Sequence, residues 1–169
     1  MSYFEKCFEE TLLKEGGYSY HKNDTGGETM FGITKEVAIK NGYYGNMKDL
    51  PLPLAKKIYK KDYWDINKLD EIKNIEIACE IFDTGVNCGV RTAAKFMQEA
   101  YNLLTPGNKL VTDGIIGKNT IKLINEFNKP ERILKLSNAL QAEYYLKITR
   151  NREANESFIF GWLDKRVKI

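Results

Sequence analysis

The residue best placed for chemistry in this sequence is Glu15, at the end of a stretch that begins near Ser2. If residues 2–15 form a helix with about 100° between neighbours, Glu15 points within about 20° of Phe4 and so toward the interior. A carboxyl group in apolar surroundings tends to keep its proton near neutral pH, which makes Glu15 a candidate general acid. An inward Glu can also be a structural acid that Arg or backbone amides satisfy.

A second carboxyl group follows at Asp24, in a glycine-rich segment expected to form a hairpin over the helix end. Two carboxyl groups that flank a cleft are what glycosidic bond cleavage requires. Glu28 is the reserve candidate for the second acid. A separation of about 6.5–9.5 Å favours inversion of configuration and about 5–5.5 Å favours retention, and the sequence leaves this distance open.

Both acids belong to a longer pattern of glycines and threonines. It reads Glu15-Gly16-Gly17-Tyr18, then Asp24-x-Gly26-Gly27-x-Thr29-x-x-Gly32-Ile33-Thr34. This pattern resembles glycoside hydrolase family 108, bacterial and phage N-acetylmuramidases that include proteins labelled secretion activators. The spacing from Glu to Asp is also similar to that of phage-type lysozymes. The resemblance continues through Phe82-Asp83-x-x-Val86-Asn87-x-Gly89 to the closing run Phe158–Arg166.

The resemblance implies a peptidoglycan hydrolase that cleaves the β-1,4 bond between N-acetylmuramic acid and N-acetylglucosamine, with inversion by analogy with phage-type lysozymes. Glu15 would protonate the leaving oxygen, and Asp24 would activate water or stabilise positive charge. The partner is then the peptidoglycan glycan strand. Two alternatives stay open: a non-catalytic peptidoglycan-binding module in which Glu15 is structural, and a wall-opening accessory of a protein-secretion system.

Several side chains are candidates for substrate binding. They are Tyr18, Thr29, Thr34, Tyr63, Trp64 and Asn87. The threonines can position water or sugar hydroxyls, and flat aromatic rings suit the apolar face of a pyranose. Tyr63 and Trp64 can equally pack in the core. Asp83 and Asn87 share one face of a helix, where they either hold the hairpin or a substrate amide, or lie in solvent.

Apolar periodicity and capping signals predict a mainly α protein, and the resemblance makes it a lysozyme-like helical domain with a small β-hairpin after the first helix. Expected helices cover residues 2–15, 35–41, 75–88, 91–104 and 130–150, with two more opening near 51 and after 119. Residues 1–90 form the lysozyme-like catalytic part, and residues 91–169 a helical peptidoglycan-binding-like part packed with it as one compact unit. Asp113-Gly114-x-x-Gly117-x-x-Thr120 is similar to a motif of small peptidoglycan-binding modules, although a tight turn before a capped helix accounts for it equally well.

The composition is that of an ordinary globular chain, with 43% hydrophobic and 29% charged residues among 169. The net charge of +3 suits an anionic polymer such as the bacterial cell wall and is too small to indicate nucleic-acid binding. No apolar run reaches the roughly 20 residues of a membrane span, so membrane insertion is not expected. The amino terminus lacks secretory-signal features, which predicts synthesis in the cytoplasm and action on the wall after holin-type or specialised release.

Cysteine and histidine patterns predict no metal and no cofactor. Cys7, Cys79 and Cys88 match neither a zinc site nor a disulfide framework, so they are expected to be reduced packing residues. His21, the single histidine, has no partner at a metal-ligand spacing and is expected to lie in a loop. Ser-His and Cys-His catalysis are therefore not expected either.

Overall fold

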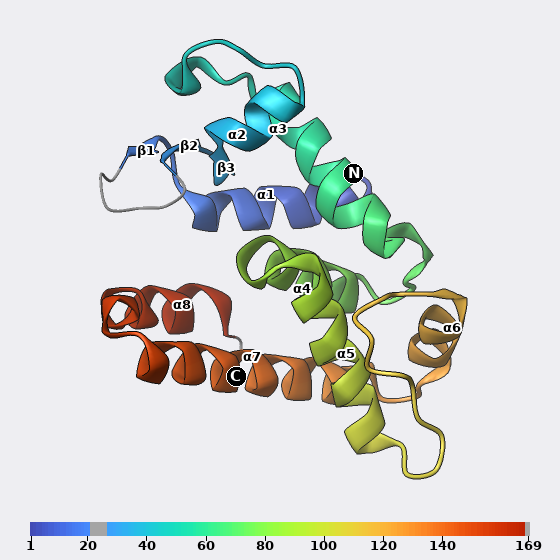
Figure 1. The fold of residues 1–169 in the computed structure, drawn as a ribbon. Helices are drawn as coiled ribbons and strands as arrows, with labels where there is room; N and C mark the ends of the chain where they lie inside the picture. Colours follow the sequence, from blue (N-terminus) through green and yellow to red (C-terminus); the bar gives the residue numbers. More distant parts are fainter. Residues whose placement is uncertain (21–26, 168–169) are drawn as a thin grey trace.

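The computed structural model describes residues 1–20 and 27–167, and helices dominate it (Figure 1). The helices are α1 (Tyr3–Glu15), α2 (Lys35–Lys40), α3 (Leu52–Tyr59), α4 (Ile75–Cys88), α5 (Val90–Leu104), α6 (Lys118–Glu126), α7 (Pro130–Asn151) and α8 (Ile159–Arg166). Short 3-10 or π turns occupy Met47–Asp49, Lys60–Trp64, Asp65–Asn67, Leu69–Glu71 and Glu153–Ser157. A small antiparallel sheet follows α1, so the predicted lysozyme-like, mainly α fold is confirmed.

Helix α1 ends where the glycine pattern predicts. Its first turn is held by a capping box, in which the Glu5 amide donates to the Ser2 hydroxyl over 3.2 Å and the Ser2 amide donates to the Glu5 carboxylate over 3.0 Å. Glu15 is its last residue, and Gly16 follows with a φ of +75° that a side chain would disfavour. The chain therefore leaves the helix immediately after the candidate acid.

The sheet has the order β1-β2-β3, with β1 (Ser19–Tyr20), β2 (Glu28–Met30) and β3 (Ile33–Thr34). Thr29 pairs with Ser19 on one side and with Thr34 on the other. The turn between β2 and β3 is Phe31-Gly32, and both residues have positive φ, as tight two-residue hairpin turns require. This turn returns the chain toward the end of α1.

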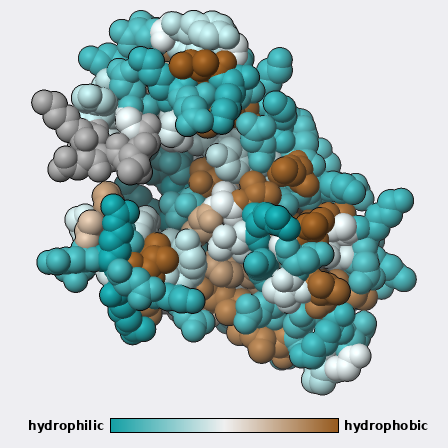
Figure 2. Space-filling view, in the orientation of Figure 1, coloured by the Kyte–Doolittle hydropathy of each residue, from teal (hydrophilic) through white to brown (hydrophobic). Residues whose placement is uncertain are grey.

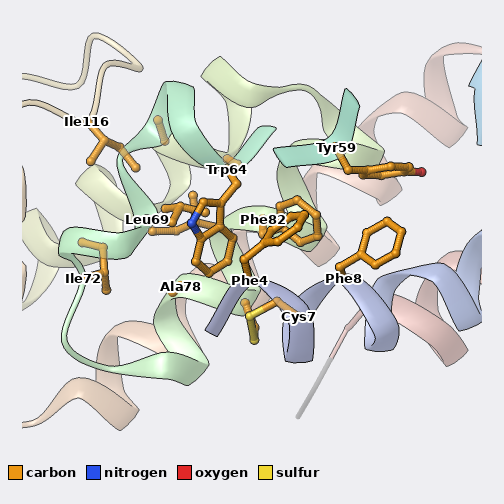
Figure 3. Close-up of a cluster of buried hydrophobic side chains, with 14 of the residues drawn as sticks. Phe4, Cys7, Phe8, Tyr59, Trp64, Leu69, Ile72, Ala78, Phe82 and Ile116 are labelled. Carbon is orange, nitrogen blue, oxygen red and sulfur yellow. A yellow bond between two sulfur atoms is a disulfide. The ribbon is translucent and has the colours of Figure 1, made fainter. Parts of the chain in front are cut away.

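Aromatic side chains fill the core between α1, α4 and the end of α3 (Figure 3). Trp64 is fully buried beside Phe4 and Phe82, and Phe8 and Tyr59 lie on the far side of these two rings. Its ring meets Phe4 and Phe82 edge-on, with centroids 5.5 Å and 5.7 Å away. Such contacts contribute about 0.5–1.5 kcal/mol each beyond the burial of apolar area. The cluster fixes α1 against α4.

Helix α4 is enclosed by other helices, as its nearly continuous apolar sequence predicts. It packs against α1 on one side and against α5 and α7 on the other, so it belongs to both halves of the chain. Helix α8 folds back along α7 and faces the end of α1 (Figure 1). Within the described part of the chain, no helix is long and apolar enough to cross a membrane.

The expectation of three reduced cysteines is wrong for two of them. Cys7 of α1 and Cys79 of α4 form a disulfide, with Cα atoms 4.9 Å apart and a separation of 72 positions in sequence. Sequence spacing missed it because the pairing depends on how two distant helices pack. Cys88 is free and half-buried, and burial raises the pKa of its thiol.

Removing this disulfide by Cys7→Ser and Cys79→Ser should lower the free energy of unfolding by about 4 kcal/mol, since the bond closes a long loop in the unfolded chain. Urea unfolding with and without reductant measures the difference. Cys88→Ser is the control and should change the free energy of unfolding little. A count of three free thiols in the denatured, unreduced protein, or equal stability with and without reductant, would contradict the pairing.

Candidate active site

Glu15 lies beneath the turn between β2 and β3, with 17% of its side chain exposed. A Cβ atom built on Gly32 would lie 2.5 Å from Oε2 of Glu15 and 2.8 Å from the Tyr59 hydroxyl. The backbone of Gly32 also has a φ of +73°. Glycine is needed here for both reasons, because the carboxyl group approaches the backbone too closely for any side chain.

Tyr59 holds the same turn. Its hydroxyl donates to the carbonyl oxygen of Phe31 over 2.7 Å, and its ring lies 5.5 Å from that of Tyr63. Burial is the main cause that raises the pKa of both tyrosines, and the nearby Glu15 carboxylate adds to it. The hydroxyl groups of Tyr59 and Tyr63 therefore stay protonated beside Glu15.

Arg166, from α8, forms an ion pair with Glu15. Its Nη2 donates to Oε1 of Glu15 over 2.6 Å, and its Nη1 donates to Oδ1 of Asp83 over 2.7 Å. Burial alone would lower the pKa of the guanidinium, but the Asp83 and Glu15 carboxylates outweigh it and raise that pKa. The expectation that Glu15 has apolar surroundings is therefore wrong on one side, because its Oε1 accepts from a buried cation. Its other oxygen, Oε2, faces Gly32.

Asp83 is the second acid that binds Arg166. Besides the guanidinium, its carboxylate accepts from the Thr11 hydroxyl over 3.0 Å and pairs with Lys14 at 3.0 Å. It is buried, so of the two roles considered for it, solvation is wrong. Asp83 therefore holds the cation that contacts Glu15.

The structure separates the two aromatic candidates that follow one another in sequence. Trp64 has no exposed surface and lies in the core, so its prediction as a substrate-binding residue is wrong. The helical turn that carries it points it at Phe4 and Phe82. Tyr63 is half-buried beside Tyr59 and near Glu15, so it stays a predicted substrate contact.

The hairpin carries a second acid whose charge is stabilised. Glu28 accepts from Lys35 and from the Tyr18 hydroxyl, each over 2.9 Å, and these bonds lower the pKa of its carboxyl group. Glu28 in turn raises the pKa of Tyr18, and the Lys48 ammonium sits 5.0 Å from the Tyr18 ring centroid. Glu28 is therefore suited to stabilising positive charge and unsuited to donating a proton.

The predicted threonines serve the backbone. The Thr29 hydroxyl donates to the carbonyl oxygen of Ser19 over 3.5 Å, across the sheet. The Thr34 hydroxyl accepts from the Val37 amide over 3.3 Å and caps α2. Asp24, the predicted second catalytic carboxylate, lies outside the described residues, so its distance from Glu15 and the inverting outcome stay predictions.

The surface is hollowed beside Arg166. A cavity of about 240 Å³ is lined by Lys14, Asn87, Ser157, Phe158, Gly161, Trp162, Lys165 and Arg166. Figure 2 shows the indentation on the left, above α8. Asn87, at its edge, accepts a hydrogen bond from the Tyr145 hydroxyl over 2.7 Å. A larger cavity of about 360 Å³ lies away from Glu15, between α1, α4 and α7.

The Asp113 turn is explained by packing. Gln98 donates to the Asp113 carboxylate and accepts from the Gly114 amide, each over 2.9 Å. A side chain at Gly114 would collide with the carbonyl oxygen of Arg91, 2.7 Å away. The motif fixes the loop between α5 and α6, as the explanation by a tight turn before a helix expects.

Sequence reasoning missed Arg166, Lys14 and Tyr59. The run that ends at Arg166 carries the family resemblance, but nothing local indicates that this arginine meets Glu15. Tyr59 resembles any core aromatic in sequence. Only the packing of α8 and α3 around the end of α1 brings these groups together.

Fold and site together define a lysozyme-like protein, with a helix-terminal Glu beneath a small sheet and a helical bundle behind it. Known families agree with this class. Residues 8–89 match the family described as Glycosyl hydrolase 108, and residues 92–167 match the one described as Predicted Peptidoglycan domain. The first match covers the part of the chain that carries Glu15, and the second covers most of the remainder.

Solved structures give the same fold. The structure of SagA from Brucella abortus is similar with a TM-score of 0.77 at 23% identity, over 96% of this chain and 88% of that one. At this identity the likeness shows the fold alone. A comparison with curated proteins gave no match.

Replacing Arg166 by Gln should lower the free energy of unfolding by about 3–5 kcal/mol, because a buried ion pair loses its cation. Arg166→Lys keeps the charge without the two-pronged geometry and should fall between wild type and Arg166→Gln. Urea unfolding measures both.

Arg150→Gln is the matched control, since Arg150 is exposed on α7, and it should stay within about 0.5 kcal/mol of wild type. If Arg166→Gln were as stable as this control, the ion pairs would not hold α8 to α1 and α4.

Proposed function

We propose that this chain is an N-acetylmuramidase that hydrolyses the β-1,4 bond between N-acetylmuramic acid and N-acetylglucosamine. The observation that carries the proposal is Glu15: it ends α1 beneath Gly32, with Oε1 bound to Arg166 and Oε2 turned toward the hairpin. The match of residues 8–89 to a glycosyl hydrolase family supports the reaction class. Peptidoglycan is the substrate that the second family match supports.

In the proposed reaction, Glu15 gives its proton to the oxygen of the leaving sugar as the bond to the anomeric carbon breaks. Water attacks the opposite face of that carbon, and its proton passes to a second carboxylate, which inverts the configuration. Asp24 is the proposed second carboxylate. Glu28 is the alternative, and its lowered pKa keeps it negative, as a group that stabilises the oxocarbenium-like transition state should be.

In the free protein, Nη2 of Arg166 donates to Oε1 of Glu15 over 2.6 Å. Acid catalysis needs the proton, so binding must favour the neutral acid. A glycan that covers Glu15 excludes water from the site, and removal of water disfavours the charged carboxylate. Arg166 and Asp83 meanwhile hold the carboxyl group so that one oxygen remains directed at the substrate.

The carboxy-terminal part is proposed to bind the glycan and to complete the catalytic part. It corresponds to residues 91–169, and the catalytic part to residues 1–90. The bond from Arg166 to Glu15 joins these two stretches, which supports the proposal that they pack as one compact unit. The disulfide fits action outside a reducing cytosol, since such bonds persist in oxidising compartments.

A non-catalytic peptidoglycan-binding module is the second candidate. The Glu15–Arg166 pair is the observation that favours it, because a purely structural acid also needs such a partner. A wall-opening accessory for protein secretion would use the same hydrolysis in another biological setting.

Glu15→Gln keeps the shape of the side chain but removes its proton, and should reduce the release of reducing ends from purified cell walls by about 10²–10⁴-fold. Glu9→Gln, on the exposed face of α1, is the matched control and should retain activity. Sedimentation with walls should show that both variants still bind.

Asp24→Asn and Glu28→Gln are assayed in parallel for the release of reducing ends. The second carboxylate is the one whose replacement lowers this release more. If wild type and Glu15→Gln bind walls equally and neither releases reducing ends, the protein is a binding module.

A further inference from the structure

The cavity beside Arg166 has features that the hydrolytic step leaves unused. It measures about 240 Å³ and lies against the ion pair that holds Glu15, since Lys14 precedes Glu15 in the chain and Arg166 bonds to it. This volume is below the roughly 300–1,000 Å³ usual for whole small-molecule ligands. It therefore suits a substituent of a sugar better than an entire sugar unit.

The charges around the cavity favour an anion. Three cations line it, Lys14, Lys165 and Arg166, and none of the described residues that line it is acidic. Lys14 and Arg166 also pair with Asp83 and Glu15, so these two cations and two acids cancel. Exposed Lys165 leaves the rim with a surplus positive charge.

One wall of the cavity is a stack of aromatic rings. Trp162 stacks on buried Tyr145 with centroids 5.0 Å apart, and exposed Phe158 stacks on Trp162 at 5.9 Å. The Tyr145 hydroxyl donates to Oδ1 of Asn87 over 2.7 Å. This bond fixes the stack and leaves the Asn87 amide nitrogen as a donor at the cavity edge. The wall thus combines apolar ring faces with a hydrogen-bond donor.

We propose that this cavity is a subsite for a carboxylate carried by the muramic-acid side of the glycan, next to the bond that is cut. The inference rests on the proposed function. Among the two alternating sugars of peptidoglycan, only N-acetylmuramic acid bears a lactyl group, whose acid either is free or continues as a stem peptide with further carboxylates. The carboxylate meets Lys165 and the Asn87 amide, and the methyl groups beside it pack on Phe158 and Trp162. The subsite distinguishes muramic acid from N-acetylglucosamine.

The test uses the full chain and three probes: N-acetylmuramic acid, N-acetylmuramyl-L-alanyl-D-isoglutamine, and N-acetylglucosamine as the uncharged comparison. Trp162 supplies the signal, because the other of the two tryptophans, Trp64, is fully buried. The acidic probes should protect Trp162 from quenching by acrylamide, and N-acetylglucosamine should not. Tighter binding of the first probe assigns the lactyl carboxylate, and tighter binding of the second assigns the stem peptide.

Lys165→Gln should weaken binding of the acidic probes about fivefold, the effect of losing one exposed ion pair, and salt should weaken wild type similarly. Lys147→Gln, exposed on α7, removes the same charge away from the cavity and should bind as wild type. Phe158→Ala should weaken binding without changing its dependence on salt.

Equal protection by all three probes, no protection by any, or equal binding by the Lys165 and Lys147 variants would overturn the subsite. This result is independent of the hydrolysis assay. Active enzyme without probe binding defeats the subsite alone, and probe binding without hydrolysis by wild type defeats the enzyme proposal alone.

Discussion

The arrangement depends on one buried guanidinium. Arg166 is almost fully covered and binds an acid from α1 and an acid from α4, so three helices from both halves of the chain meet at one cation. Taking an unpaired ion out of water costs several kcal/mol, and this cost is offset only when the partners are all in place. Thr11 donates to the same Asp83 oxygen as Arg166, and Lys14 pairs with the other oxygen. The end of α1 cannot shift without disturbing this group, which is why Glu15 keeps a defined direction.

Much of the site could be predicted because its signals are local. Helical periodicity predicts that Glu15 points inward, and the helix ends at Glu15, immediately before Gly16. The conformation of Gly32 follows from a tight turn, and its closeness to Glu15 leaves no room for a side chain. The Thr34 hydroxyl caps α2 through the Val37 amide, three residues further along the chain. These features depend on residues that are close together in the chain, so the sequence alone is enough to predict them.

The remaining features depend on contacts between distant segments. The Cys7–Cys79 disulfide and the Arg166 pair join residues far apart in the chain, and no spacing rule relates them. Trp64 and Tyr63 are adjacent, yet one is buried and the other half-exposed, because a helical turn directs neighbours to different sides. Periodicity indicates that an aromatic side chain faces inward, but only packing shows whether it meets the core or a groove.

The proposed function requires a proton donor, a cation that orients it and a cavity suited to the muramic-acid substituent. Mass spectrometry of cell-wall fragments, after digestion by wild-type protein and reduction of the new ends with borohydride, shows which bond is cut. The account predicts fragments that end in reduced N-acetylmuramic acid. Fragments that end in reduced N-acetylglucosamine, or none above an untreated control, would contradict it.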